Sequence, residues 1–297
     1  MRGVTVQRTS ELLALGLNQR DLGNAQTAGL RAKVRHGAYV DAAAEDAVGR
    51  HRHRIAATWP LLADHTVISH ASAGLLHGLP TWDQLLERVW VTRQTGHGKR
   101  TKNLVVTQAA LSEIEVTEQF GYQLTSLERT AADYARSVNY PHAVAVLDAA
   151  LHNGAELGLL SAIIDAARHR KGAAIARRAL EFADPRAESV GESLSRVVIA
   201  QSGLPAPVLQ YEILRDGVWV ARTDFAWPRY RLIGEFDGRI KYLGTSSEVA
   251  DTVMREKRRQ SAIEAAGWTV VRWTWSDLTP PTTLHALLSP HLAPRNA

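Results

Sequence analysis

The sequence predicts an α+β protein built from several domains, and three observations carry that prediction. The chain has 297 residues, more than the ~250 residues beyond which a single hydrophobic core seldom grows. Its residue pattern changes twice, near residue 45 and near Asp184. Hydrophobic residues make up 45% of the chain, yet no apolar run approaches the ~20 residues of a membrane helix. We therefore expect domains over residues 1–45, 46–184 and 185–297, and no membrane partner.

The composition excludes several chemistries. The chain contains no cysteine, so disulfides, thiolate zinc sites, iron–sulfur clusters and Cys nucleophiles are excluded. No small-residue cleavage site follows the short N-terminal apolar stretch, which predicts a cytoplasmic protein. The formal charge is only +5, but six Lys/Arg and two Asp/Glu lie within residues 1–40. Most of the positive excess is therefore in the N-terminal region.

The first region has the pattern of a winged helix-turn-helix. A short helix ends at Leu15 and Gly16, Asn18 is a suitable N-cap, and a second helix is expected over residues 19–28. The segments LRAKV and AYV then read as two short strands around a turn at His36 and Gly37. Such a module places its second helix in the major groove of double-stranded DNA.

Side chains that suit DNA occur in both parts of this module. Amides, guanidinium and hydroxyl groups that can read base edges lie on the second helix, at Gln19, Arg20, Asn24, Gln26 and Thr27. Groups that suit phosphates lie on the wing, at Arg31, Lys33, Arg35 and His36. The alternative is a small solvated subdomain with ordinary surface charge, and Gly23 within the second helix favours it.

The middle region is predicted to be mostly helical. Helical apolar spacing recurs in ERTAADYARSV, HAVAVLDAALHNG, LLSAIIDAARHR and AAIARRALEFA. Two short strands, RVWVT and LVVT, are expected around the turn GHGKRTKN. His51 and His53 are expected on a solvated basic face, and His70, for which no Ser or Asp partner is evident, is expected to be a hydrogen-bonded structural residue.

Three motifs in this part of the chain carry a resemblance to a known family. They are the basic strand that leads into Arg35-His36-Gly37-Ala38-Tyr39, the segment VISHASAGLLHGLP, and the segment LTSLERTAADYAR. In this order they resemble the AbiEi family of type IV antitoxins over about residues 9–155. The resemblance implies a DNA-binding antitoxin or transcriptional regulator, with a nucleotidyltransferase-type toxin encoded nearby as its partner.

Acidic residues gather in the third region. If the strands around Arg229 and Tyr230 form a hairpin, Asp224 lies opposite Glu235 with Cβ atoms about 5 Å apart, and Asp237 shares the face of Glu235. Three carboxylates at one position repel one another unless a cation lies between them, which suits Mg²⁺ or Mn²⁺. Lys241 is then placed to polarise a water or phosphate, and Glu192 on the preceding helix to complete the set.

A structural interpretation of the same residues remains open. Asp237-Gly238 is also a turn dipeptide, and Glu235 has Arg222 and Arg239 as candidate ion-pair partners. A strand with three acids is sometimes only an exposed edge.

The order of elements in this region resembles the PD-(D/E)XK nuclease superfamily. A helix with Glu192 precedes strands with Asp224 and with Glu-x-Asp-Gly, a basic helix, and GWTVVRWTWSDL. Over about residues 186–280 this order is similar to the domain related to very-short-patch-repair endonucleases, which implies a restriction-endonuclease-like α/β fold. The resemblance assigns Asp224 and Glu235 to the metal, Glu192 to the helix acid and Arg258 to the basic helix. Asp237 stands where the superfamily motif has Lys, so Lys241 must supply the amine.

Three functions follow as hypotheses. The first is a DNA-binding regulator of the AbiEi type with a nuclease-like C-terminal domain. The second is an active Mg²⁺-dependent or Mn²⁺-dependent DNA endonuclease. The third is a non-enzymatic protein whose Ala-rich middle binds a partner. No phosphate loop or dinucleotide fingerprint occurs, so no organic cofactor is expected.

Overall fold

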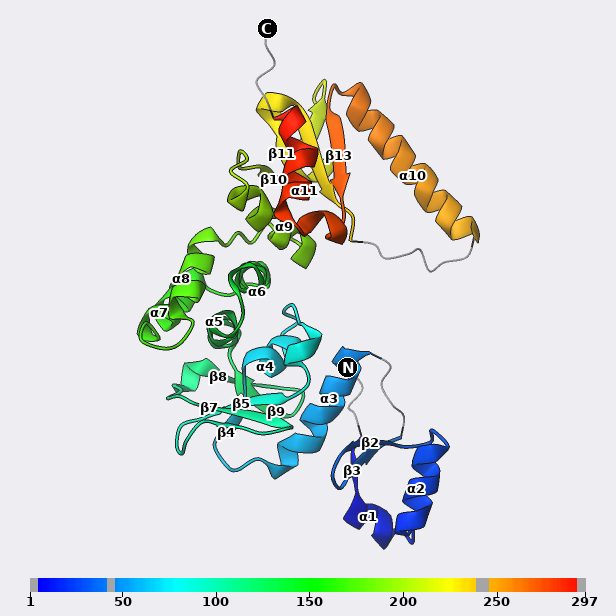
Figure 1. The fold of residues 1–297 in the computed structure, drawn as a ribbon, viewed down its shortest axis with the longest axis vertical. Coiled ribbons are helices and arrows are strands. Elements are labelled where there is room, and N and C mark those ends of the chain that lie inside the picture. Colours follow the sequence, from blue (N-terminus) through cyan, green and yellow to red (C-terminus); the bar gives the residue numbers. More distant parts are fainter. Residues whose placement is uncertain (1–4, 42–45, 239–245, 293–297) are drawn as a thin grey trace. The chain divides into compact units, whose positions relative to one another are not determined.

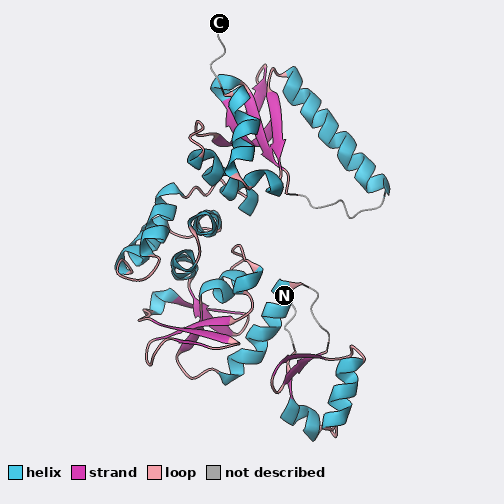
Figure 2. Ribbon diagram, in the orientation of Figure 1, coloured by secondary structure: helices cyan, strands magenta, loops and turns pink. Residues whose placement is uncertain are grey.

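The computed structural model describes residues 5–41, 46–238 and 246–292 (Figure 1). The chain forms two compact units, one of Met1–Val138 with Ala155–Arg177 and the other of Asn139–Gly154 with Arg178–Ala297. Helices and strands are mixed in both, and the strands form three sheets (Figure 2). Within the described residues, no helix combines the length and the apolar character needed to cross a membrane.

The first unit begins with a small module that we call the N-terminal module. It consists of β1 (Gln7–Arg8), α1 (Thr9–Ala14), α2 (Gln19–Thr27), β2 (Ala32–Arg35) and β3 (Ala38–Val40). The strands form an antiparallel sheet in the order β1-β3-β2. The two helices and the hairpin therefore occupy the residues predicted for them.

Local signals and a small core explain the module. The Asn18 side chain accepts the backbone N–H groups of Arg20 and Asp21 at 2.8 and 3.0 Å, and Asp21 in turn accepts the N–H of Asn18 at 2.8 Å. This reciprocal capping begins α2 at the predicted residue. Leu12 and Leu22 then pack against Tyr39 of β3, which holds both helices on the sheet.

The rest of the first unit is built on a six-stranded mixed sheet in the order β6-β7-β5-β4-β9-β8. Its strands are β4 (Thr66–Ile68), β5 (Val89–Arg93), β6 (Lys99–Arg100), β7 (Leu104–Gln108), β8 (Val116–Gln119) and β9 (Tyr122–Thr125). Its helices are α3 (Ala47–Thr58), α4 (His70–Leu76), α5 (Leu127–Ser137) and α7 (Leu157–Ala166). Ile55 of α3 and Ile68, Val91 and Leu124 of the strands lie in its core.

This sheet corrects the expectation of only two strands around a turn. The predicted strands exist as β5 and β7, but they pair in parallel, and β6 lies between them in the sequence. The other strands are only two to four residues long. Such segments are too short to show alternation in the sequence. Two of them, β4 and β9, also depend on pairing with strands that are distant in the sequence.

The second unit combines helices with a four-stranded sheet in the order β10-β11-β12-β13. Its strands are β10 (Val208–Arg215), β11 (Val218–Trp227), β12 (Leu232–Phe236) and β13 (Thr269–Trp273). Its helices are α6 (Tyr140–His152), α9 (Val190–Gln201), α10 (Ser246–Ala265) and α11 (Pro281–Leu288). The first three strands pair antiparallel and β13 adds in parallel to β12. Helix α8 (Ala173–Phe182) contains the passage between the units at Arg177.

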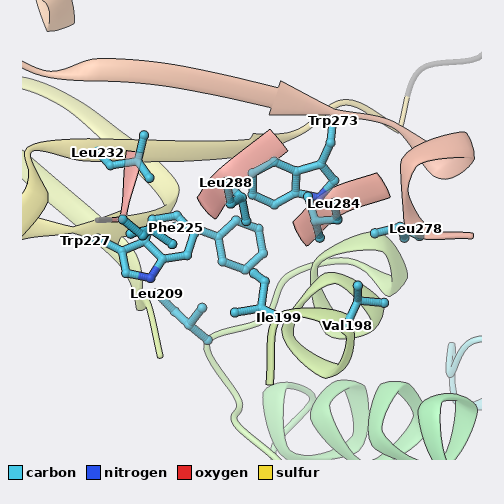
Figure 3. Close-up of a cluster of buried hydrophobic side chains, with 11 residues drawn as sticks. Val198, Ile199, Leu209, Phe225, Trp227, Leu232, Trp273, Leu278, Leu284 and Leu288 are labelled. Carbon is cyan, nitrogen blue, oxygen red and sulfur yellow. The ribbon is translucent and has the colours of Figure 1, made fainter. Parts of the chain in front are cut away.

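Large apolar side chains fill one face of this sheet (Figure 3). Phe225 and Trp273 are almost fully buried, with ring centroids 5.2 Å apart, and Ile199 and Leu284 pack there from α9 and α11. Burial of this size is the main source of stability for such a domain. Short 3₁₀ helices complete both units, at Trp59–Leu61 (η1), Asp83–Leu85 (η2), Glu113–Glu115 (η3), Pro228–Tyr230 (η4), Trp275–Leu278 (η5) and Ser289–His291 (η6).

Helix α6 joins the second unit through a buried ion pair. Nη1 of Arg196 on α9 donates to Asp148 of α6 at 2.7 Å, and both side chains are at least nine-tenths buried. Nη2 of the same arginine donates to the carbonyl of Phe182 at 2.6 Å. Burial raises the pKa of Asp148, and the arginine opposes that shift.

Candidate nucleic-acid interface and acidic cluster

The outer face of α2 presents polar side chains to solvent. Leu22 packs inward, so the opposite side of the helix is exposed. All five residues predicted to read bases are exposed, at Gln19, Arg20, Asn24, Gln26 and Thr27, but Gln19 and Gln26 flank Leu22, and only the other three lie opposite it. Residues 20, 24 and 27 follow helical i, i+4, i+7 spacing and form one stripe. In the described part of the chain, the guanidinium of Arg20 has no hydrogen-bond or ion-pair partner, so it is free to contact a ligand.

The basic residues of the wing divide into two groups. Lys33 and His36 are exposed. Arg31 instead donates to the Gln7 side chain and lies 3.8 Å from the Asp41 carboxylate. Arg35 donates to Thr58 of α3 at 3.3 Å, and its Nε is buried without a partner.

The sequence alone could not separate these groups. Gln7 and Thr58, which occupy the two engaged arginines, lie more than 20 residues away from them along the chain. Of the predicted phosphate contacts, Lys33 and His36 are thus the available ones. The N-terminal module therefore exposes polar groups on α2 and two basic side chains on its hairpin.

In the second unit, the hairpin register matches the predicted one. Phe225, Ala226 and Trp227 pair with Gly234, Ile233 and Leu232, and the same register continued by one step places Asp224 opposite Glu235. The Asp224 carboxylate also accepts the N–H of Phe236 at 3.0 Å. The two strands therefore bring these acids to one edge of the sheet.

A glycine allows α9 to approach the same edge. A Cβ at Gly191 would lie 1.8 Å from the Phe236 ring. Gly191 directly precedes Glu192, so the close approach of the α9 backbone brings this carboxylate to the strand that carries Glu235. On β12 itself, Gly234 leaves room for the Trp273 ring, which would lie 2.5 Å from a Cβ there.

Glu192, Asp224 and Glu235 lie close enough for their charges to interact. Burial raises the pKa of Asp224 to about 6, and the negative charges of the two glutamates add to the shift. Glu192 is itself buried and accepts the N–H of Glu188 at 3.0 Å and the amide of Gln210 at 2.9 Å. We call these three residues the acidic cluster.

The remaining predicted site residues are less informative. Asp237 is half-buried, and its N–H donates to the carbonyl of Trp273 at 2.8 Å. Lys241 lies outside the described residues. Arg258, which the nuclease resemblance assigned to the basic helix, is exposed, whereas its neighbour Arg259 turns toward the cluster.

Both oxygens of Glu235 are bonded to arginines. Nη2 of Arg259 lies 2.5 Å from one oxygen, and Nε of Arg272 lies 2.9 Å from the other. Glu256 contacts the same two guanidinium groups at 3.0 and 2.9 Å. Arg222, expected as a partner of Glu235, instead pairs with Glu188 at 2.9 Å.

The two arginine partners of Glu235 were not predicted because they lie far from it along the chain. Arg272 stands directly opposite Glu235 in the parallel register of β12 and β13, and Arg259 reaches it from α10. Parallel pairing across an intervening helix leaves no short-range pattern in the sequence.

The acidic cluster has only part of what a divalent cation requires. Its carboxylates are the hard donors that Mg²⁺ prefers. However, Glu235 has both oxygens engaged, and within the described ranges no three His, Asp or Glu side chains are grouped so that they could hold a metal ion. As arranged here, the described residues do not fit a metal without displacement of Arg259 and Arg272.

Of two histidines in the first unit, His51 contradicts its sequence-based interpretation, whereas His70 is the hydrogen-bonded structural residue that was predicted. His51 is fully buried rather than on a solvated face, with its ring nitrogens 2.6 Å from the Leu86 carbonyl and 2.8 Å from the Ser72 hydroxyl. His70 has a hydroxyl partner after all, Ser69, at 2.9 Å. Burial lowers the pKa of both histidines to about 4.

Comparison with known proteins found relatives but no functional assignment. No family model matches the chain. Uncharacterized proteins of two Mycobacterium tuberculosis strains are each 33% identical to it over 245 residues, which is 80% of this chain and 86% of each relative.

Proposed function

The chain belongs to the family of these two mycobacterial proteins, and we propose that it is a cytoplasmic DNA-binding regulator of the AbiEi antitoxin type. In this proposal the N-terminal module is a winged helix-turn-helix, and α2 enters the major groove. The observation that carries the proposal is the exposed polar stripe of α2, in which the Arg20 side chain has no internal partner within the described residues.

The position of charge supports this assignment. Lys33 and His36 are exposed on the hairpin that follows α2, where they can contact phosphates while α2 contacts bases. Residues 1–40 carry most of the net positive charge of the chain. A module that is more basic than the rest of its chain is attracted to DNA in the orientation that brings this surface forward.

The C-terminal domain supplies a second nucleic-acid contact in this proposal. Lys257 and Arg258 are exposed on α10, next to the residue that reaches the acidic cluster. A nuclease-like domain that keeps its basic helix can bind a DNA backbone whether or not it cleaves. A nucleotidyltransferase-type toxin, encoded by a neighbouring gene, remains the proposed protein partner.

The test is a selection of bound duplexes from a random-sequence DNA pool by the full-length protein. We expect a sequence motif to be enriched, and Arg20→Ala to weaken binding to the selected duplex by about tenfold or more. Arg215→Ala, which removes an equal charge at an exposed turn of the second unit, is the matched control and should bind as the wild type does. Absence of any enriched motif, or equal binding by Arg20→Ala, would contradict the proposal.

A metal-dependent endonuclease is the second candidate, and the meeting of Glu192, Asp224 and Glu235 at one sheet edge favours it. For cleavage, Mg²⁺ or Mn²⁺ would have to displace the two arginines from Glu235. Plasmid DNA incubated with the protein and either metal tests this candidate. Cleavage that disappears in Asp224→Ala would establish it, and an unchanged plasmid would exclude it under those conditions.

A further inference from the structure

A cavity of about 470 Å³ lies within the first unit, where the N-terminal module meets α3, η1 and β9. This volume is within the ~300–1,000 Å³ range of small-molecule sites. One side of the cavity comes from the module and the other from the sheet-bearing part of the unit. A ligand held there would contact both.

The module side of the cavity is basic. Arg8 and His36 line it together with the hydroxyl-bearing residues Thr9 and Ser10. No Asp or Glu is among the described residues that line the cavity. In the same described ranges the Arg8 guanidinium has no hydrogen-bond or ion-pair partner, unlike Arg31 and Arg35 of the same module.

The opposite side is apolar and aromatic. Trp59 and Tyr122 meet edge to face, with ring centroids 5.7 Å apart and planes at 76°. Leu61, which is 52% exposed, also lines this side. Aromatic walls of this kind bind flat rings well.

We propose that this cavity binds a small aromatic organic anion, with its ring against Trp59 and Tyr122 and its charged group on Arg8 and His36. An unpaired guanidinium attracts a carboxylate or similar anion through charge-assisted hydrogen bonds. A bare inorganic ion has no ring to pack against Trp59 and Tyr122, so the aromatic side adds nothing to its binding. The basic half alone would suit any anion, and the aromatic half alone would suit any flat ring, so the two together favour an aromatic anion.

Occupation of the cavity has a consequence that rests on the proposed function. His36 is one of the two available phosphate contacts of the wing, and it also lines the cavity. An anion bound there occupies His36, which is then no longer available to DNA phosphate. The ligand therefore weakens DNA binding, which makes the cavity an effector site.

The binding test uses 1-naphthoate and the full-length protein, followed by ligand-observed NMR. A ligand of this size at ordinary efficiency binds with a Kd of about 1 mM. We expect 1-naphthoate to bind at least about tenfold more tightly than neutral 1-naphthalenemethanol and than inorganic phosphate. Binding of 1-naphthoate no tighter than that of either other probe, or no binding of 1-naphthoate, overturns the inference.

Variants locate the binding in this cavity. Arg8→Met should weaken 1-naphthoate binding about tenfold, and Leu61→Glu should weaken it as well by placing a negative charge at an exposed edge of the cavity. Lys102→Met removes an exposed charge of the same unit outside the cavity and should bind as the wild type does. Unchanged binding by both Arg8→Met and Leu61→Glu overturns the inference.

The DNA arm separates the two proposals. Addition of 1-naphthoate should lower the affinity of the wild type, but not of Arg8→Met, for the selected duplex. If the protein binds no DNA while 1-naphthoate binding depends on Arg8, the proposed function fails and the ligand site stands. If DNA binding is present and unaffected by bound 1-naphthoate, the effector role is wrong.

Discussion

The α2 stripe and the acidic cluster both consist of polar side chains, but those of the stripe are exposed and those of the cluster are largely buried and bonded within the protein. On α2 the polar groups are exposed, and Arg20 has no partner in the described part of the chain. In the cluster, Glu235 is 7% exposed and bonded through both oxygens to Arg259 and Arg272. Free polar groups on a surface are available to a ligand, whereas paired buried groups first stabilise the fold. This difference is why DNA binding, rather than cleavage, is the better-supported function.

The largest effect is expected on stability, from the loss of the ion pairs of Glu235. Glu235→Ala leaves Arg259 and Arg272 beside a buried gap, so we expect the unfolding free energy of the protein to fall by about 3 kcal/mol. This is the lower end of the range for a broken buried ion pair, because both arginines are about one-third exposed. Urea unfolding measures the change. Glu212→Ala, on the exposed face of β10, should change stability by no more than about 0.5 kcal/mol. A loss below about 1 kcal/mol for Glu235→Ala would show that its ion pairs are not structural.

The second effect concerns the buried histidines of the first unit. Their folded-state pKa of about 4 lies below the ordinary histidine pKa of 6.5, so between these values the unfolded chain binds more protons than the folded chain. Stability is therefore lost as the pH falls from about 6.5 toward 4, by about 2 kcal/mol per histidine at pH 5. Urea unfolding at pH 7.5 and pH 5 measures this loss.

His70→Asn sharpens that measurement. His70 has a φ of +50°, a conformation that asparagine tolerates better than most residues. We expect the variant to be less stable than the wild type at pH 7.5 but to lose less stability on acidification. Equal losses in the two proteins would mean that His70 does not contribute to the pH dependence.

The third effect tests whether the exposed stripe of α2 reads DNA bases. Asn24→Ala should reduce the preference for the selected duplex over unrelated DNA by about 1–2 kcal/mol, because an amide that reads a base edge is lost. Stability should stay within about 0.5 kcal/mol of the wild type, since the side chain is exposed. Competition binding with the two duplexes measures the preference. An unchanged preference would remove Asn24 from the interface.

The smallest effect separates Lys33 from Arg35 within the wing. Lys33→Ala should lower the slope of log affinity against log salt by about 1, as expected for one lost phosphate contact. Arg35→Ala should leave that slope unchanged and lower stability instead, because Arg35 is engaged with Thr58. Binding titrations across a range of salt concentrations measure the slopes. The reverse result would assign the phosphate contact to Arg35.

How far the sequence predicts this molecule depends on the range of each interaction. Asn18 and Asp21 act within one helical turn, so the start of α2 was predictable to the residue. The hairpin register of β11 and β12 was predictable from the turn between them. The pairing of Arg272 with Glu235, in contrast, depends on a parallel strand that arrives 37 residues later, and no local pattern encodes it.

The candidate sites follow the same division. The α2 residues were predicted as exposed, and the structure exposes all five. The engaged state of Arg31 and Arg35 was not predicted, because their partners belong to other elements. His51 was misassigned for a similar reason: its burial depends on Leu86 and Ser72 from distant segments. Residue type suggested the chemistry, but long-range pairing decided which groups remain available.

The assignment of α6 to the second unit has a consequence for synthesis. The chain leaves the first unit at residue 138, returns at 155 and leaves it again at 177. On the ribosome, α6 therefore emerges before α9, and Asp148 must wait for Arg196. During that interval an apolar helix with an unpaired acid is exposed, which is a stage at which chains aggregate or recruit chaperones. A fragment that ends before Arg196 never acquires the arginine that pairs with Asp148. Because the chain passes between the units more than once, no single cut yields two complete units.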